Sequence, residues 1–312
     1  MRLGIIGLGI MGERLLRAAL EHPGTEVTGV WDPAAQAQTR LAGTGLSMAA
    51  SAEAVIAGAE AVYVASPPAS HIAHGRAALG AERALFLEKP LASDVASARD
   101  FVASARGQRA AVNFPMASSP AALRLRGWLD AAPAVQSLEI ELGFATWPRG
   151  WQRDAASWLS GRTEGGFLRE VGSHFLFLAQ RVGGPLALVE GQARFPAADA
   201  SEDEVTARLL AGAVPVTLRG AVGRTSADDT NTCTVAWAGG RVRLRDWSFA
   251  ERWMDGAWLP DPDAMPNERM RPVTLAGQLD QLAAMTRGEA TRLATLEEAL
   301  GVQEVVEAIL AG

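Results

Sequence analysis

Lys89 is the only lysine in this chain of 312 residues, and it lies in the segment Glu88-Lys89-Pro90, directly after an apolar run. Lysine and arginine together number 29, so every other residue of this kind is an arginine. Arginine stays protonated and is broad and planar, whereas lysine is a compact ammonium whose pKa falls readily on burial. A lysine used at one position only therefore indicates chemistry, such as moving a proton or holding an oxygen at a reacting carbon. The alternative is a surface residue without a role.

His174 and Glu170 are the second and third candidates for chemistry. Oxidation of a secondary alcohol removes a hydroxyl proton while hydride leaves the same carbon. An imidazole titrates near pH 7 and is suited to accept that proton, so His174 is the candidate base. The ammonium of Lys89 would stabilise the developing alkoxide, and Glu170 would orient either partner. The alternatives are a structural histidine, since Phe175 to Leu178 is apolar, and an acid that only caps a helix.

A glycine-rich turn near the N-terminus has the spacing of a dinucleotide site. Residues 7–12 read Gly-Leu-Gly-Ile-Met-Gly, after a strand pattern and at the start of a helical one. In the GxGxxG pattern the first glycine permits a tight turn, the second lets a pyrophosphate approach, and the third lets helix and strand pack closely. The helix N-terminus supplies N–H donors. The predicted contacts are Gly7, Gly9, Ile10, Met11 and Gly12, and the alternative is a turn that binds nothing.

Asp32 lies at the predicted end of the second strand, where a cofactor ribose is expected. A carboxylate there accepts hydrogen bonds from both ribose hydroxyls and repels a 2′-phosphate. Pro33-Ala34-Ala35 follows and supplies no arginine for such a phosphate. The sequence therefore predicts NAD rather than NADP as the cofactor.

The elements that position these residues change character near residue 115. Before it, strand patterns alternate with helical ones, and the strands are expected near 3–7, 26–31, 61–65, 84–87 and 109–114. This alternation predicts an α/β fold with a doubly wound parallel sheet. After it, alternation such as that from Leu138 to Phe144 predicts strands buried on one face only. We predict a dinucleotide-binding Rossmann domain over 1–115. Over 116–312 we predict a substrate-binding and oligomerisation α+β domain on a largely antiparallel open sheet.

Composition excludes several classes of protein. The net charge of −6 argues against a nucleic-acid partner. Cys233 is the only cysteine, so an intramolecular disulfide and a cysteine-rich zinc site are excluded, and no metal is expected. No run of 18 apolar residues occurs, so no membrane span or membrane partner is expected. Glycines interrupt the apolar N-terminus, unlike in a signal peptide, and we expect a cytoplasmic protein.

Four segments, taken together and in order, resemble those of a known family. They are residues 7–12, 66–71 (Ser-Pro-Pro-Ala-Ser-His), 88–90 (Glu-Lys-Pro) and 165–174 (Gly-Gly-Phe-Leu-Arg-Glu-Val-Gly-Ser-His). The chain resembles the Gfo/Idh/MocA family of nicotinamide-dependent oxidoreductases, the glucose–fructose oxidoreductase and inositol dehydrogenase group. The likeness covers essentially the whole chain and is strongest over 1–115 and 160–178. It implies an NAD(P)-dependent dehydrogenase or reductase that forms homodimers or homotetramers through the C-terminal sheet.

The resemblance also implies a lysine, an aspartate and a histidine that meet at the nicotinamide, with the aspartate four residues before the histidine. Lys89 and His174 match this pattern, whereas Glu170 stands in place of the aspartate. The extra methylene moves the carboxylate by about one ångström, which matters in a preorganised site. The departure therefore counts against a sugar or an inositol as the substrate.

Further candidates surround the predicted cofactor. Ser66, Pro67 and His71 open a helix beside it, with a structural cap as the alternative role of His71, and Glu88 and Lys89 follow the next strand. Asn113 ends the last strand of the first domain and is predicted to face the nicotinamide and the substrate. Tyr63, the only tyrosine, lies in the middle of a strand, so we expect a core residue and no tyrosine acid.

A tryptophan- and arginine-rich segment, residues 145–164, precedes the glycine-histidine segment. It holds Trp147, Arg149, Trp151, Arg153, Trp158 and Arg162. Indoles can stack on a ring and arginines can hold a carboxylate, so the segment would line a substrate pocket. We predict substrate contacts at Trp147, Trp151 and Arg162. The alternative is a domain interface with solvated arginines.

The sequence predicts an oxidoreductase that transfers hydride between NAD(H) and a CH–OH or C=O carbon. The substrate would be a small polar molecule such as a sugar, a cyclitol or a derivative. Alternatives are a ketone or imine reductase of a specialised pathway and a non-catalytic cofactor-binding sensor. Lys89 and His174 argue against the sensor, since it needs neither a base nor a lone lysine.

Overall fold

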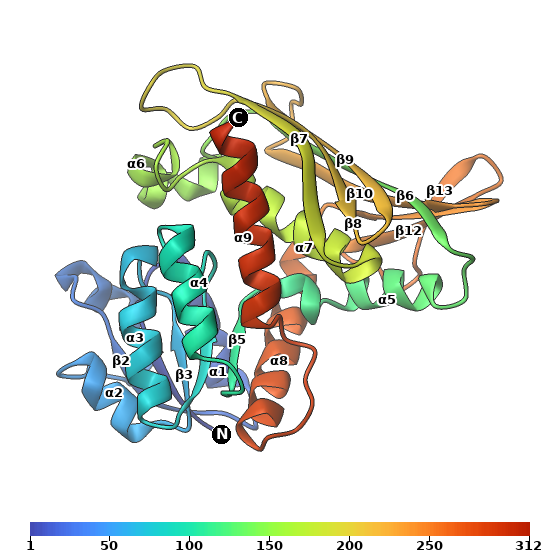
Figure 1. Ribbon diagram of the computed structural model, residues 1–312. Helices are drawn as coiled ribbons and strands as arrows, with labels where there is room; N and C mark the ends of the chain where they lie inside the picture. Colours follow the sequence, from blue (N-terminus) through green and yellow to red (C-terminus); the bar gives the residue numbers. More distant parts are fainter. The chain divides into compact units, whose positions relative to one another are not determined.

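A computed structural model describes the backbone elements of the chain and the side chains of residues 1–152 and 158–312, and the side chain of the predicted loop residue Arg153 lies outside these residues. The chain forms two compact units, one of Met1–Ser118 with Arg271–Leu300 and one of Ser119–Met270 with Gly301–Gly312. Figure 1 traces the elements along the chain. The division into functional domains over 1–115 and 116–312 stays a prediction.

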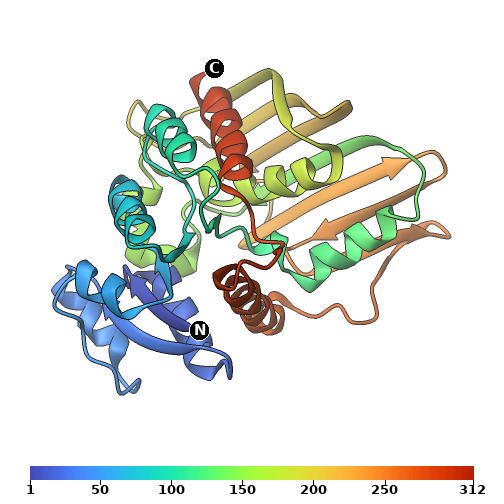
Figure 2. The ribbon, with the colours of Figure 1, turned by 60° about the horizontal axis from the view of Figure 1, so that its bottom comes forward.

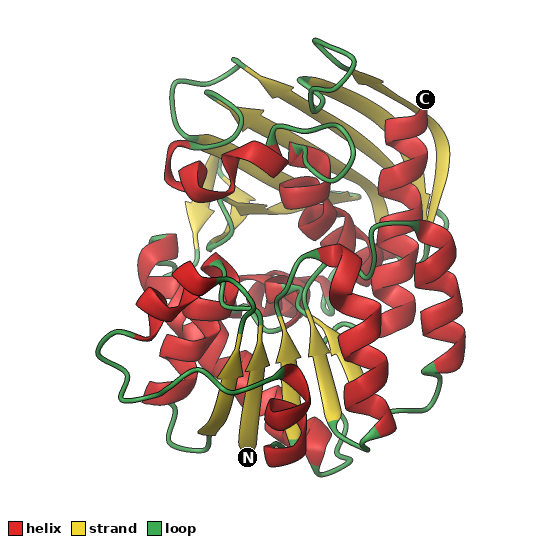
Figure 3. Ribbon diagram, turned by 90° about the vertical axis from the view of Figure 1, so that its left-hand side faces the viewer, coloured by secondary structure: helices red, strands yellow, loops and turns green.

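The first unit is built on a parallel sheet of five strands in the order β2-β1-β3-β4-β5. The strands are β1 (Arg2–Ile6), β2 (Glu26–Trp31), β3 (Ala61–Val64), β4 (Ala84–Leu87) and β5 (Ala110–Val112). Their arrows run in one direction in Figure 3. β3 and β4 are continuous apolar runs with every residue buried, as expected where helices cover both faces of a sheet. The predicted Rossmann sheet is confirmed.

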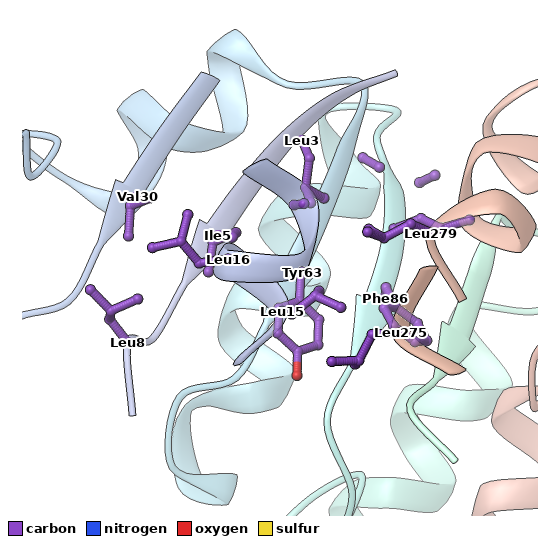
Figure 4. Packing of buried hydrophobic residues seen from close by; sticks show 14 of the residues in the cluster. Leu3, Ile5, Leu8, Leu15, Leu16, Val30, Tyr63, Phe86, Leu275 and Leu279 are labelled. Atoms are coloured by element: carbon purple, nitrogen blue, oxygen red, sulfur yellow. The ribbon is translucent and has the colours of Figure 1, made fainter. Parts of the chain in front are cut away.

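Helices cover both faces of this sheet. They are α1 (Ile10–Glu21), α2 (Ala52–Gly58), α3 (Pro68–Gly80), α4 (Val95–Ser104), the short helices Ala35–Leu41 and Pro115–Ala117, and α8 (Asn267–Thr286) from Arg271 onward. One face packs Tyr63 and Phe86 against Leu16 of α1 and Leu279 of α8 (Figure 4). The opposite face packs against α2 and α3, and α4 packs on α3. A segment from the last part of the sequence therefore completes the core of the first unit.

The second unit is built on a sheet of eight strands in the order β13-β12-β11-β10-β6-β9-β8-β7. The strands are β6 (Val135–Phe144), β7 (Leu186–Arg194), β8 (Glu204–Ala211), β9 (Val214–Val222), β10 (Asp229–Trp237), β11 (Gly240–Arg245), β12 (Phe249–Met254) and β13 (Ala257–Pro260). Only β6 and β9 pair in parallel. The predicted largely antiparallel sheet is therefore confirmed.

Helices cover one face of the eight-stranded sheet. α5 (Pro120–Leu129) packs on β11 and β12, and α7 (Ser173–Gly183) packs on β6, β8 and β10 (Figure 2). The remaining helical segments are Gly150–Ala155, α6 (Ala156–Leu159), Leu168–Gly172 and the end of α9 (Leu296–Ala311). β8 alternates buried and exposed residues, as a half-covered sheet requires. The outer face of the sheet carries Glu139 and Glu141 of β6, and both residues are exposed.

Three properties of the described residues bear on the function. No helix among them is long and apolar enough to cross a membrane. Within residues 1–152 and 158–312, no group of three or more His, Cys, Asp or Glu side chains could hold a metal ion. Cys233 is buried in β10, and burial raises the pKa of its thiol to about 12, so this cysteine is an unreactive core residue.

Candidate active site

The turn between β1 and α1 has room for glycine only at two of its positions. Gly7 has φ of +90°, and a Cβ there would lie 2.4 Å from the backbone nitrogen of Ser66. A Cβ on Gly12 would lie 2.1 Å from the oxygen of Gly7. At Gly9 a Cβ would meet nothing within 4 Å, so the backbone there faces open space. Two glycines thus allow close packing and the third lets a ligand reach the backbone, as a pyrophosphate requires.

The start of α1 offers the donors that a phosphate needs. Ile10 and Met11 form its first turn and are partly exposed, and Gly9 precedes it without a side-chain cap. The first N–H groups of a helix have no partner within the helix, and the helix dipole favours negative charge there. The predicted contacts from Gly7 to Gly12 therefore fit the pyrophosphate of a dinucleotide.

Asp32 follows β2 and is fixed by two backbone donors. Its Oδ2 accepts a hydrogen bond of 2.7 Å from the N–H of Leu8, and its Oδ1 accepts one of 2.8 Å from Ala34. The carboxylate is therefore tied to the glycine-rich turn. Each carboxylate oxygen has a further lone pair, so Asp32 can still accept hydrogen bonds from ribose hydroxyls.

The ends of β3 and β4 are linked by His71. Its Nε2 lies 2.7 Å from the carbonyl oxygen of Ser66, and its Nδ1 lies 2.8 Å from that of Pro90. His71 is buried at 1% exposure, and burial lowers the pKa of its imidazole. Pro67 precedes α3 and is exposed. His71 thus joins the two loops expected beside the cofactor, and a direct cofactor contact stays a prediction.

Lys89 lies at the carboxyl end of β4, before a cis bond to Pro90. It is half-buried, and its N–H donates to Oε2 of the preceding Glu88 at 3.3 Å. Oε1 of Glu88 accepts from the hydroxyl of Tyr63 and, at 2.6 Å, from Nδ2 of Asn113. The only lysine of the chain therefore follows a carboxylate that buried donors hold in place.

Tyr63 and Asn113 are both buried, at 0% and 1% exposure. Burial and the neighbouring Glu88 carboxylate raise the pKa of Tyr63 well above its ordinary value, so the phenol keeps its proton and acts as a donor. Asn113 also accepts a hydrogen bond from Nε2 of Gln278 in α8. Its predicted contacts with the nicotinamide and substrate stay predictions, while the structure shows its amide bonded to protein partners.

The second unit carries His174 and Glu170 on one continuous helical segment. Leu168–Gly172 is a π-helical turn that runs directly into α7. Glu170 lies half-buried in this turn, and His174 lies in the first turn of α7 at 6% exposure. Turns of this kind are rare and frequently occur at functional sites.

Trp247 packs against the candidate base and was not predicted as a site residue. Its ring lies edge-on to that of His174, with centroids 5.1 Å apart, and it also contacts Phe175. Asp246 and Trp247 have φ of +47° and +71°, a conformation that is uncommon outside glycine. Such strain is often found at functional sites. No turn motif at Asp246-Trp247 pointed to this conformation in the sequence.

Glu202 anchors the start of the same helical segment. It is buried at 1% exposure, and its Oε1 accepts a hydrogen bond of 2.7 Å from the N–H of Leu168. Gly166 has φ of +103°, and a Cβ there would lie 2.1 Å from Oε2 of Glu202. Burial raises the pKa of Glu202 to about 7. The glycine thus makes room for a buried acid that the sequence did not mark as a candidate residue.

Arg169 ties the segment to α9. It forms two hydrogen bonds of 2.7 Å to the carboxylate of Glu307 and donates to the carbonyl oxygens of Arg162 and Gly165. Planar, bidentate pairs of this kind are geometrically specific. The π-helical turn is therefore held at its start by Glu202 and along its side by Glu307.

The tryptophan- and arginine-rich segment is partly built into the second unit. Trp147 donates to the carbonyl oxygen of Leu159 and packs against Phe144. Arg149 is buried and pairs with Asp229 at 2.6 Å, while Trp151 is 44% exposed.

Arg162 is exposed and stacks on the ring of Phe195, with its guanidinium carbon 3.7 Å from the ring centre. The contacts predicted for Trp147, Trp151 and Arg162 with a substrate stay predictions.

Each unit thus groups its own share of the candidate residues. The first unit places its candidates around the carboxyl ends of the parallel strands, and these are Gly7, Gly9, Gly12, Asp32, Ser66, His71, Glu88, Lys89 and Asn113. The second unit holds Glu170 and His174. Together, the glycine turn, the acid after β2 and the parallel sheet define a dinucleotide-binding protein with a Rossmann fold.

Comparison with protein families gives a match over residues 1–114 to Gfo/Idh/MocA, described as an oxidoreductase family with an NAD-binding Rossmann fold. Residues 1–114 therefore form an NAD-binding Rossmann domain of the Gfo/Idh/MocA oxidoreductase family. Comparison with curated proteins finds no match.

Solved structures similar to this chain extend over its whole length. One is a UDP-N-acetylglucosamine 3-dehydrogenase from Acidithiobacillus ferrooxidans, with 19% identity, a TM-score of 0.78, and coverage of 100% of this chain and 97% of that one. Another is an oxidoreductase from Agrobacterium radiobacter in complex with NAD+, L-tartaric acid and magnesium, with 15% identity, a TM-score of 0.82, and coverage of 100% and 96%.

A third similar structure is a variant of a 3-ketoreductase from Actinomadura kijaniata in complex with TDP-benzene and NADP. It has 21% identity and a TM-score of 0.77, and the alignment covers 100% of this chain and 97% of that one. These likenesses show that the chain shares both parts of its fold with these proteins.

We predict that Glu202 makes the stability of the second unit depend on pH. The native state keeps a proton on Glu202 up to about pH 7, whereas an ordinary glutamate releases it near 4.5. The contribution of this group to the free energy of unfolding therefore falls by on the order of 3 kcal/mol as pH rises between these values. Denaturant unfolding at pH 5 and pH 8 should show Glu202→Gln gaining stability relative to wild type at the higher pH.

The matched control is Glu204→Gln, since Glu204 begins β8 and its ion pair with Arg194 is largely exposed. We expect this variant to keep the pH dependence of the wild type. If Glu202→Gln also keeps it, Glu202 does not titrate near neutral pH.

Proposed function

We propose that this protein is an NAD(H)-dependent oxidoreductase that transfers hydride to or from a CH–OH or C=O carbon of a small, sugar-like molecule. The observation that carries the proposal is Lys89, the only lysine. It is fixed after β4 at the same edge of the sheet as the glycine turn and Asp32. A cofactor bound along that edge presents its reactive ring near the ends of the strands.

The roles of the side chains follow from the chemistry of alcohol oxidation. The bound nicotinamide supplies the hydride acceptor. His174 takes the hydroxyl proton, since a neutral imidazole is an effective base near pH 7. The Lys89 ammonium donates a hydrogen bond to the oxygen as negative charge develops on it. In the reducing direction, the same two groups return the proton to the product oxygen.

Glu170 is proposed to orient His174 or the substrate from the π-helical turn. It lies on the same helical segment as His174, and Glu202 and Arg169 fix that segment. Trp247 packs on the ring of His174 and limits its rotation. A rigid support of this kind lets a small displacement affect the rate strongly.

The sugar-like substrate class is supported by the similar structures. They include a UDP-N-acetylglucosamine 3-dehydrogenase and a 3-ketoreductase, both of which share the two-part fold of this chain. Arg149 is buried and paired with Asp229, whereas Arg162 is exposed in the same segment. We therefore propose Arg162, with the exposed Trp151, as the residues that contact the outer part of the substrate.

Lys89→Arg tests the proposed function directly. We expect turnover to fall at least about 100-fold, because the broad guanidinium cannot replace a compact ammonium at the reacting oxygen, while the dissociation constant for NAD stays within about threefold. The measurement is reduced-nicotinamide absorbance of wild type and variant with NAD or NADP against nucleotide sugars, sugars, inositols and hydroxy acids.

The matched control is Arg76→Lys, an exchange of the same two residue types at an exposed position of α3. It should turn over as wild type does. Unchanged turnover in Lys89→Arg would remove Lys89 from the chemistry. If the wild type binds NADH but gives no absorbance change with any of these substrates, a ketone or imine reductase would be favoured first and a cofactor-binding sensor second.

We propose NAD as the preferred cofactor and predict that Asp32→Asn weakens the preference. The amide keeps the size of the side chain but loses the charge that would repel a 2′-phosphate. The ratio of kcat/KM for NAD to that for NADP should fall about tenfold or more, which corresponds to about 1.4 kcal/mol. Asp100→Asn, at an exposed position of α4, is the control. An unchanged ratio in Asp32→Asn would show that Asp32 does not select the cofactor.

We also propose a cytoplasmic homodimer or homotetramer that assembles through the outer face of the eight-stranded sheet. On that face Arg241 stacks on Trp253, with 4.0 Å between guanidinium and ring centre, and Arg243 stacks on Trp258 at 4.2 Å. Arginine and tryptophan are enriched in protein interfaces. Sedimentation velocity should therefore find no monomer at micromolar concentration, and a monomer would contradict this assembly.

A further inference from the structure

A chain of hydrogen bonds connects α8 to the backbone of Lys89. Nε2 of Gln278 donates to Oδ1 of Asn113, and Nδ2 of Asn113 donates to Oε1 of Glu88. The Tyr63 hydroxyl donates to the same oxygen of Glu88, and Oε2 of Glu88 accepts from the N–H of Lys89. The first and last residues of this hydrogen-bond network, Lys89 and Gln278, are 189 positions apart in the sequence.

The four side chains that form this hydrogen-bond network are buried, so water does not compete for their hydrogen bonds. Gln278 and Asn113 are each 1% exposed, Tyr63 is 0% exposed and Glu88 is 7% exposed. A buried polar group without a partner is costly, so each bonded donor and acceptor here keeps its partner, although Oε1 of Gln278 has no hydrogen-bond partner among the described residues. The network therefore fixes the position of the Glu88 carboxylate.

The direction of every bond is set by the carboxylate. Glu88 only accepts, so Asn113 must turn its NH₂ group to Glu88 and its oxygen to Gln278. That oxygen in turn requires a donor, which is the NH₂ group of Gln278. Reversal of either amide would place two acceptors face to face. The orientation of one amide in α8 is thus coupled to the carboxylate beside Lys89.

We propose that Gln278, Asn113 and Tyr63 are positioning residues that act on the reaction through Glu88, by holding the backbone of Lys89. The inference rests on the proposed role of Lys89 in turnover. His71 holds the other side, since its Nδ1 lies 2.8 Å from the carbonyl oxygen of Pro90. The backbone is thus held before and after the lysine, and the ammonium reaches a fixed point at the reacting oxygen.

Gln278→Glu tests the proposal because it replaces the hydrogen-bond donor to Asn113 by an acceptor while the side chain keeps almost the same shape. An ionised glutamate cannot donate to Asn113, so the amide of Asn113 must turn and leave Glu88 facing an acceptor. We expect kcat to fall at least tenfold at pH 9, with the dissociation constant for NAD within threefold of wild type. When the new carboxyl binds a proton at lower pH, its O–H can donate as the native amide does.

The pH profile separates positioning from simple destabilisation. The ratio of variant to wild-type kcat should rise at least fivefold between pH 9 and pH 6. The titratable groups around Glu88 are Lys89, which follows it in the sequence, Tyr63 from β3 and His71 from α3. All three are present in the variant and in the wild type, so their effects on kcat cancel in the ratio. Gln278→Leu cannot donate a hydrogen bond at any pH. Its kcat should be low, and the ratio of its kcat to that of the wild type should not change with pH. Tyr63→Phe should lower kcat as well.

A spectroscopic readout keeps the test independent of turnover. Because Lys89 is the only lysine, the full chain labelled with ¹⁵N-lysine gives one backbone amide signal. That signal belongs to the N–H bonded to Glu88. It should shift in Gln278→Glu at pH 9 and return toward the wild-type position at pH 6. The control is Gln281→Glu, a change of the same type on the same helix at a residue whose Oε1 accepts from Arg292.

Each outcome decides one point. A shifted amide with acid-restored turnover supports the proposal, and so does a loss in Tyr63→Phe with unchanged cofactor binding. An unmoved amide signal and a wild-type kcat in Gln278→Glu would overturn it. A shifted amide in a protein whose wild type turns over no substrate would refute the proposed function while leaving the network intact.

Discussion

The parallel direction of the five strands in the first unit is the constraint on which the rest of this site depends. Because the strands run the same way, their carboxyl ends meet at one edge of the sheet. Gly7, Asp32, Ser66, Glu88 and Asn113 lie at or just beyond the ends of β1 to β5, in that order. Residues far apart in sequence therefore gather there without any long loop to carry them, and rigid strands fix their spacing.

The sequence was sufficient for the parts of the site that depend on local spacing. The glycine turn, Asp32 and the strand before Lys89 were predicted because each combines a turn or end signal with an apolar run. Gln278, Glu202 and Trp247 were not, since their partners lie far away in the sequence and no local pattern marks them. Tyr63 was predicted as core, which is confirmed by its burial, but its bond to Glu88 needed the packed sheet.

Two buried acids show how hydrogen bonding decides the behaviour of a carboxyl group. Oε1 of Glu88 receives donors from Tyr63 and Asn113, which suits an ionised carboxylate. Glu202 receives the N–H of Leu168 on one oxygen, while its other oxygen has no hydrogen-bond partner among the described residues. One acid therefore serves as a fixed acceptor in the first unit, and the other is a titrating group at a helix start in the second.

The return of the chain to the first unit has a consequence for its biosynthesis. Leu275, Leu279 and Leu282 complete the core that begins with Leu3 and Ile5, so that core stays open until the ribosome has added these leucines. Proteins of several domains commonly fold from the N-terminus as they emerge. Here the nucleotide-binding unit comes first in the sequence, but its core can close only after the second unit has been made. A nascent chain halted before residue 271 would therefore expose apolar surface that a chaperone must shield.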